Sequence, residues 1–203
     1  MQYKVGFWRK HAVKAALDRH EDRAHSWGGH RVVKFPSDLM AMQKLLTRCQ
    51  PEVLVEIGTQ YGGSALFFSS FVDSVVTADI AEVPGRPASP RITYLTGDAA
   101  SAEVFGKVKA LVGTRRCSVV IDGDHNAAQV DKELALYAPL VGPGQALILE
   151  DTLVDVLNFR KFRAAGGPLR SIRKFMPANP AFHIAEGVEP YLTTNFFGYW
   201  VRK

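Results

Sequence analysis

Cysteine is scarce in this sequence, and its two cysteines form no recognisable metal or disulfide pattern. Cys49 and Cys117 are too few for a disulfide framework and too far apart for the ligand spacing of a zinc site. The sequence therefore does not predict a disulfide-stabilised secreted scaffold. Cys117 opens an apolar segment, so we expect it to be buried in the core.

Long hydrophobic runs are also missing. No apolar run in the 203 residues approaches the roughly 20 residues that a transmembrane helix needs. The basic N-terminus, with Lys4, Arg9, Lys10 and Lys14, has no apolar segment behind it, which does not fit a secretory signal. We therefore expect a cytoplasmic protein with no membrane partner. A hydrophobic share of 47% is typical of a soluble globular chain, here long enough for one domain with a substantial core.

Negative charge is scarce at both ends of the chain. Residues 1–34 hold eight Lys/Arg against three Asp/Glu, whereas residues 35–150 hold nine against thirteen and residues 151–203 hold eight against four. Basic ends would suit nucleic-acid contact, but no RNA-binding motif accompanies them. Solvated faces, or contacts between the subunits of a homo-oligomer, are the better interpretation. We divide the chain into a basic arm, residues 1–30, and a main domain, residues 31–203.

Strand patterns and helix patterns alternate along the main domain. Apolar runs predict strands at 53–57, 75–79, 92–95, 118–121 and 146–149, and the last segment predicts a β-hairpin of 182–185 with 196–201. This alternation predicts an α/β fold with a doubly wound, mainly parallel, Rossmann-like sheet. Ser37, Ser101 and Asn126 are expected to be the N-caps of helices between the strands. In the helix after Ser101 the predicted apolar face carries Val104, Val108 and Leu111.

The most informative segment runs from residue 53 to residue 64 and reads VLVEIGTQYGGS. A buried strand, a glycine turn and a helix N-terminus in this order form a site for a nucleotide-like ligand. Gly58 allows a sharp turn, and Gly62 and Gly63 are expected to let a ligand approach the backbone closely. The spacing is not the G-x-G-x-x-G of dinucleotide enzymes, which disfavours a nicotinamide dehydrogenase. With Glu56, the pattern E-x-G-x-x-x-G resembles the first motif of class I S-adenosylmethionine-dependent methyltransferases.

Acidic residues follow four of the predicted strands, at the edge of the sheet where ligands bind. Asp79 lies 23 residues after Glu56, a separation that suits an acid bonded to ribose hydroxyls; a helix cap is the alternative. Asp98 and Ala99 follow the third strand, where a side chain meets the adenine amino group, although Gly-Asp is also a common turn.

The remaining acids point to a metal. Asp122 and Asp124 follow the fourth strand, and Glu150 and Asp151 follow the fifth, so four carboxylates are expected to converge. Like charges at short range repel unless a cation or a proton intervenes. Oxygen ligands without cysteine suit Mg²⁺, Ca²⁺ or Mn²⁺ better than zinc. His125 would stand beside such a metal as a general base; solvated loop acids with a capping histidine are the alternative.

Several further segments, from SWGG at Ser26 to LTTNFFG at Leu192, are similar to one known family. They resemble the cephalosporin hydroxylase family, which includes O-methyltransferases of rhamnosyl groups and macrolide sugars. The resemblance covers roughly residues 26–200 in collinear order. Its segments are SWGG from Ser26, KFPSDL from Lys34, the glycine turn, IDGDH from Ile121, ELALYAPLV from Glu133, LEDT from Leu149, GGP from Gly166 and LTTNFFG from Leu192.

This resemblance implies a Mg²⁺-dependent S-adenosylmethionine O-methyltransferase with a class I methyltransferase domain. Asp122, Glu150 and Asp151 match the metal ligands, and His125, with Asp122, matches the catalytic group. The chain departs from many relatives in having Gly123 in place of serine and in its short N-terminal arm, which leaves the acceptor open. The residues expected to bind the cofactor are Glu56, Gly58, Thr59, Tyr61, Gly62, Ser64, Asp79, Asp98, Ala99 and Asp122.

The sequence therefore predicts methyl transfer to a hydroxyl of a small molecule, a sugar or a natural-product scaffold. One alternative is a nucleic-acid methyltransferase, but the position after the fourth strand reads Asp-Gly-Asp-His and not Asn/Asp-Pro-Pro-aromatic. A second alternative is a protein that binds the cofactor without transferring its methyl group.

Overall fold

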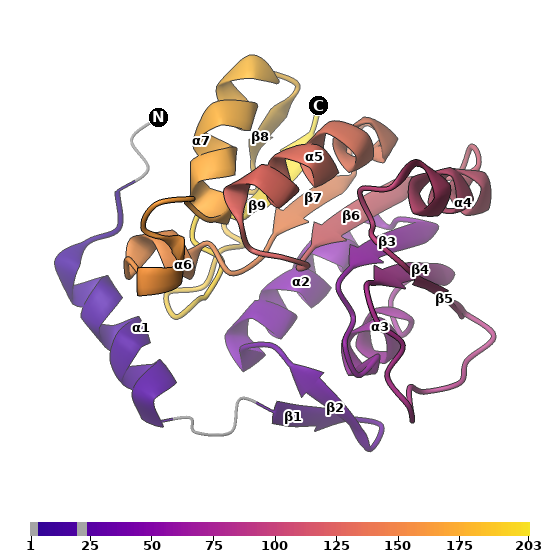
Figure 1. The fold of residues 1–203 in the computed structure, drawn as a ribbon, viewed down its shortest axis with the longest axis horizontal. Helices are drawn as coiled ribbons and strands as arrows, with labels where there is room; N and C mark the ends of the chain where they lie inside the picture. The colour runs from indigo at the N-terminus through magenta and orange to yellow at the C-terminus, as the bar shows by residue number, and fades with distance from the viewer. Residues whose placement is uncertain (1–3, 20–23) are drawn as a thin grey trace.

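The computed structural model describes residues 4–19 and 24–203, and a seven-stranded sheet runs through its centre (Figure 1). Its parallel strands are β3 (Val53–Ile57), β4 (Ser74–Asp79), β5 (Ile92–Thr96), β6 (Cys117–Ile121) and β7 (Ala146–Leu149). β8 (Phe182–Ile184) and β9 (Tyr199–Arg202) form the C-terminal hairpin, and β9 also runs antiparallel to β7. The order is β5-β4-β3-β6-β7-β9-β8. The predicted mainly parallel α/β sheet and its hairpin are confirmed.

Helices cover both faces of this sheet (Figure 1). One face packs against α4 (Ala102–Val112), α5 (Ala127–Tyr137) and α7 (Pro168–Ala178), and the other against α2 (Pro36–Cys49) and α3 (Gly63–Phe68). Every residue of β3 and β6 is buried, Cys117 included, because central strands are covered on both sides. No helix in the described ranges is long and apolar enough to cross a bilayer. Shorter helices are η1 (Ala138–Leu140), α6 (Leu153–Val156) and η2 (Arg160–Phe162).

Two of the predicted helix N-caps differ in outcome. At the start of α4, Ser101 Oγ accepts a hydrogen bond from the N–H of Val104 at 3.2 Å, as predicted. Ser37 is not an N-cap, because α2 already begins at Pro36 and Ser37 Oγ donates instead to the carbonyl of Leu192. Proline suits the first helical position because its missing N–H needs no cap there.

Two further details of the predicted helices need correction. Asn126 occupies the N-cap position of α5, but its side chain makes no cap bond and donates to Asp124. In α4, Leu111 is 37% exposed, and Val112 is the residue that completes the buried face. The helical periodicity is compatible with either Leu111 or Val112 on the apolar face. The rotation of α4 about its own axis decides which of the two side chains meets the sheet.

The predicted basic arm contains a helix, α1 (Phe7–Arg19), that packs against the C-terminal half of the same chain. Val13 and Leu17 are buried against Leu153 and Phe196. The guanidinium group of Arg9 lies 4.8 Å from the centre of the Phe196 ring. These contacts are apolar and cation–π interactions, so the charge of the arm is not its only means of attachment.

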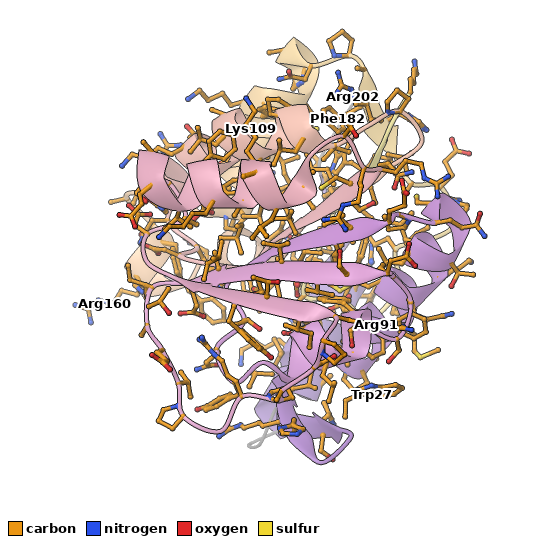
Figure 2. The ribbon with its side chains drawn as sticks, turned by 90° about the vertical axis from the view of Figure 1, so that its right-hand side faces the viewer. Trp27, Arg91, Lys109, Arg160, Phe182 and Arg202 are labelled. Atoms are coloured by element: carbon orange, nitrogen blue, oxygen red, sulfur yellow. The ribbon has the colours of Figure 1, made fainter. Side chains whose placement is uncertain are left out.

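A hairpin follows the arm helix and spans the predicted boundary at residue 30. It consists of β1 (Ala24–Trp27) and β2 (His30–Val33), and the Trp27 ring packs edge-on against Phe67 of α3. Figure 2 shows Trp27 and the β9 residue Arg202 at opposite sides of the molecule. Residues 1–3 and 20–23 lie outside the described residues, so the division into arm and domain stays a prediction.

Candidate active site

A cavity of about 680 Å³ opens at the carboxyl ends of the central parallel strands. In-register pairing places Ile57 beside Ala78 and Ile121, so the loops after β3, β4 and β6 start at the same edge. This volume lies in the usual range for a small-molecule or cofactor site. Most of the predicted cofactor residues line it, namely Gly58, Thr59, Tyr61, Ser64, Asp79, Asp98, Ala99 and Asp122, whereas Glu56 and Gly62 lie behind the lining.

The glycines of the turn after β3 are required by the protein's own packing. Gly58 has φ +87°, and a Cβ there would stand 2.2 Å from the carbonyl oxygen of Asp122. A Cβ on Gly62 would stand 2.7 Å from a tyrosine hydroxyl, and one on Gly63 would stand 2.1 Å from the carbonyl oxygen of Arg31. The sharp turn at Gly58 is confirmed. The close approach of backbone expected at these glycines is found at Gly63, while the approach of a ligand to Gly62 and Gly63 stays a prediction.

At the end of the cavity near β4 and β5, the predicted acids are bonded mainly to backbone. Asp79 Oδ2 accepts from the N–H groups of Thr59 at 3.0 Å and Gln60 at 2.7 Å, so it holds the glycine turn in place. Asp98 Oδ1 accepts from the N–H two residues later and from Nε2 of Gln129 at 3.0 Å. Both aspartates also line the cavity, where they are available to a ligand.

A buried glutamate and a glutamine at this end were not predicted as site residues. Gln129 and Glu133 lie on α5 and line the cavity, and Nε2 of Gln129 donates to Glu133 Oε1 at 3.2 Å. Glu133 Oε2 is buried and has no hydrogen-bond partner among the described residues. Burial raises the pKa of Glu133 to about 7. The hydrogen bond from Gln129 opposes this shift, and the negative charge of Asp98 adds to it. The only sequence signal was the place of Glu133 in a family segment, because the helical pattern of α5 is the same whichever face meets the cavity.

Glu56 is fully buried in β3, directly behind the turn. Its Oε2 accepts from the hydroxyl of Thr77 at 2.8 Å, whereas Oε1 has no hydrogen-bond partner in the described part of the chain. Burial raises the pKa of Glu56, and the charge of Lys34 opposes this shift. A fully buried acid in a central strand is unusual, and Glu56 lies directly behind the turn that lines the cavity.

Lys34, immediately after β2, was not singled out as a site residue by the sequence analysis. Its side chain is 3% exposed, and Nζ donates to Asp122 Oδ2 at 2.6 Å and to Glu150 Oε1 at 2.5 Å. Burial alone would lower the pKa of Lys34, but the charges of Asp122, Glu150 and Glu56 raise it well above its ordinary value. Lys34 is therefore a fixed cation and not a general base. Its only sequence signal was its place in a family segment.

The predicted metal ligands separate into two positions. Asp122, His125 and Asp151 bring one ligand atom each to within 4.8 Å of one another, and all three line the cavity. Nε2 of His125 lies 3.2 Å from Asp151 Oδ2. Glu150, by contrast, is buried against Lys34 behind this group. Asp124 lines the cavity too, and its Oδ1 accepts from the N–H two residues later at 3.1 Å.

The backbone at Asp151 explains how consecutive acids have different surroundings. Asp151 has φ +50°, in the left-handed region, and its N–H donates to Oδ1 of Asn195 at 2.8 Å. Aspartate tolerates this conformation better than most residues. The side chain of Glu150 is therefore enclosed in the protein, while that of Asp151 reaches the cavity beside His125.

Asp122, Glu150 and Asp151 together carry more negative charge than the single buried lysine, Lys34, can balance. Burial and the neighbouring charge of Asp122 raise the pKa of Glu150 well above its ordinary value, although Lys34 opposes the shift. A divalent cation would supply the missing positive charge, and the carboxylate oxygens of Asp122 and Asp151 are donors that hard cations prefer. The residues present therefore fit a metal ion of the Mg²⁺ or Mn²⁺ type.

Comparison with known proteins identifies the family. Residues 21–203 match the family model described as rhamnosyl O-methyltransferase/CmcI. The rhamnosyl O-methyltransferase of Mycobacterium leprae (strain TN) is 28% identical over 194 residues, which cover 88% of this chain and 83% of that protein.

Solved structures show the same fold. CmcI with Mg and SAM superposes with a TM-score of 0.65 at 17% identity, over 88% of this chain and 76% of that one. The MycE methyltransferase with Mg, SAH and mycinamycin VI superposes with a TM-score of 0.57 at 22% identity, over 77% of this chain and 46% of that one. The resemblance predicted from the sequence, to an S-adenosylmethionine-dependent O-methyltransferase, is confirmed. The chain belongs to the rhamnosyl O-methyltransferase/CmcI family.

Proposed function

We propose that this protein transfers the methyl group of S-adenosylmethionine to a hydroxyl of a sugar or sugar-bearing natural product, with the help of Mg²⁺. Its relatives support this acceptor class, since they include rhamnosyl O-methyltransferases. CmcI was solved with Mg and SAM, and MycE with Mg, SAH and mycinamycin VI. The observation in this chain that carries the proposal is the approach of Asp122, His125 and Asp151 at a cavity of cofactor size.

In this proposal the cofactor lies along the glycine turn. Asp79, after β4, would bond the ribose hydroxyls, and Asp98 with Ala99, after β5, would meet the adenine. Both acids line the cavity and are held by hydrogen bonds, so their carboxylates are pre-positioned for neutral donor groups. Glu56 is buried behind the turn, within the influence of the Lys34 charge, and in this arrangement it would support the turn from behind.

The acceptor would bind at the other end of the cavity. Mg²⁺ held by Asp122 and Asp151, with Glu150 behind them, would supply Lewis-acid charge that acidifies the acceptor hydroxyl, and the cofactor would supply the methyl group. His125 would take the hydroxyl proton, and the neighbouring carboxylate of Asp151 would stabilise the imidazolium that forms. The phenyl ring of Phe162, whose centre is 6.5 Å from that of His125, would shield this end from water.

Methyl transfer from isotope-labelled S-adenosylmethionine to rhamnosylated acceptors tests the proposal. We expect activity with Mg²⁺, loss of activity in excess chelator, and recovery when Mg²⁺ is restored. Full activity in chelator would overturn the role of the metal.

The same assay decides the alternatives. Transfer to nucleic acid, or tight cofactor binding with no transfer to any acceptor, would point to one of the two other functions considered above. Tight NAD binding without a response to S-adenosylmethionine or its demethylated product would contradict the cofactor assignment.

We also propose that the protein forms a homo-oligomer through its N-terminal arm. Phe7 and Trp8 of α1 are 64% and 79% exposed, and large apolar side chains that project together suit a contact with a second subunit. Light scattering on the full chain and on Phe7→Ser/Trp8→Ser protein tests this. A monomer in both samples would overturn it.

A further inference from the structure

Lys34 is placed between two strand ends that both carry negative charge. Asp122 follows β6 and Glu150 follows β7, and the ammonium group donates to one oxygen of each. The side chain of Lys34 is 3% exposed and that of Glu150 is 4% exposed. An ion pair so enclosed is screened by salt much less than a pair on the surface.

Asp122 takes part in two groups at once. Its Oδ2 accepts from Lys34, and one of its carboxylate oxygens belongs to the three-residue group with His125 and Asp151. A divalent cation bound by that group would therefore be coordinated by the Asp122 carboxylate, whose charge Lys34 already partly balances. Two positive charges that share one carboxylate repel each other, and this repulsion is stronger in a partly enclosed cavity than in bulk water.

We propose that Lys34 is a positioning residue for the metal site: it holds Asp122 and Glu150 in place before the metal binds, and it limits how tightly the site binds a divalent cation. The inference rests on the proposed Mg²⁺-assisted function. A site that binds its cation only moderately can still be assembled and stable without it, because the buried carboxylates already have a partner.

The neutral variant Lys34→Met separates the two effects. In chelator, we expect its melting temperature to be lower by about 10 °C, because breaking a buried ion pair leaves charges uncompensated. In calorimetry, we expect it to bind Mg²⁺ at least about ten-fold more tightly than the wild type, since the competing charge is gone. If Lys34 only stabilised the fold, the Lys34→Met substitution would leave Mg²⁺ affinity unchanged or weaken it.

Two further variants keep the experiment decisive. Lys34→Met/Glu150→Gln removes both partners of the buried pair, so in chelator its melting temperature should recover most of the loss. Lys174→Met is the matched control, because Lys174 also pairs with a carboxylate, Asp131 at 2.6 Å, but is 75% exposed and outside the cavity lining. It should change neither the melting temperature by more than about 2 °C nor Mg²⁺ binding.

Unchanged or weaker Mg²⁺ binding by Lys34→Met would overturn the proposal, as would a double variant no more stable in chelator than the single one. If Lys34→Met does not fold, the recovery by the double variant decides. If neither the wild type nor Lys34→Met binds Mg²⁺, the proposed metal-assisted function is wrong. The part of the proposal in which Lys34 limits Mg²⁺ affinity is then wrong too. The melting data in chelator would then still decide whether Lys34 holds the two carboxylates.

Discussion

The two ends of the cavity hold their carboxylates in different ways. At the end formed by the loops after β3 to β5, Asp79 and Asp98 accept their backbone hydrogen bonds from N–H groups of nearby turns, and the only cation near them among the described residues is Arg86, whose Nη2 lies 3.8 Å from Asp79 Oδ2. At the end formed by the loops after β6 and β7, Asp122 and Glu150 are bonded to the ammonium of Lys34, and Asp151 lies beside His125.

This difference separates two kinds of site. A carboxylate bonded to the backbone of its own turn is part of the scaffold, and its free lone pairs suit neutral hydroxyl and amino groups. A carboxylate paired with a cationic side chain lies in a field that a second cation or a proton changes strongly. We therefore propose that the cofactor binds at the first end and that the metal ion and the proton transfer belong to the second, and the predictions below examine residues at the two ends and between them.

The largest effect is expected at the charged end. His125→Ala should lower the turnover number by roughly 10²–10⁴-fold, the usual contribution of a positioned acid or base, without changing cofactor affinity. Turnover measurements and calorimetry with S-adenosylmethionine test this. His183→Ala, on β8 outside the cavity lining, is the control and should leave both unchanged. A loss of cofactor affinity equal to the loss of rate would contradict the division.

Gly58 lies where the two ends meet. Gly58→Ala should destabilise the protein by about 3–5 kcal/mol, because its Cβ would stand 2.2 Å from the Asp122 carbonyl oxygen in addition to the strain of φ +87°. Gly85→Ala is a matched control, with φ +81° and no atom within 4 Å of its Cβ, and should cost only about 1 kcal/mol. Urea denaturation measures both. Equal effects would show that backbone strain alone explains the glycine.

At the cofactor end, Glu133 should make stability depend on pH. Burial raises the pKa of Glu133 from its ordinary 4.5 to about 7, so the folded protein binds this proton more tightly than the unfolded chain. The resulting stability is fully present below about pH 4.5 and is lost as the pH rises to about 7; it amounts to roughly 3 kcal/mol.

Glu133→Gln removes that titration. The difference in unfolding free energy between wild type and variant should therefore fall from pH 4.5 to pH 7 and stay constant above it. Urea denaturation of both proteins across this range measures the difference. A constant difference would show that Glu133 is ionised across the whole range and does not bind the proton more tightly in the folded state.

The smallest effect is expected for Asp79. Asp79→Asn should weaken binding of S-adenosylmethionine by roughly ten-fold, because the amide keeps one acceptor oxygen but loses the charge-assisted hydrogen bonds to the turn. Mg²⁺ binding, measured by calorimetry, should not change. Weaker Mg²⁺ binding in this variant would show that the two ends are coupled.

The positions of strands and turns could be predicted from the sequence because they depend on residues that are neighbours along the chain. The strands β3 and β6 are mostly apolar, as expected for strands covered on both faces, and parallel pairing brings the acids that follow the strands to one edge of the sheet. The hydrogen-bond partners of side chains and the buried face of a helix depend on packing and could not be predicted from neighbouring residues. Ser37 bonds a distant carbonyl and not its own helix, and Leu111 faces solvent where Val112 faces the core.

The sequence by itself determined the order of strands and helices, the glycine turn and the acids that follow each strand, because spacing along one chain specifies these. Only the tertiary structure decided which charges meet. Lys34 is 88 residues from Asp122 and 116 from Glu150, and no local pattern joins residues so far apart. The left-handed backbone at Asp151 likewise gives two consecutive acids different surroundings, since the direction of a side chain depends on the backbone angles that the surrounding fold imposes.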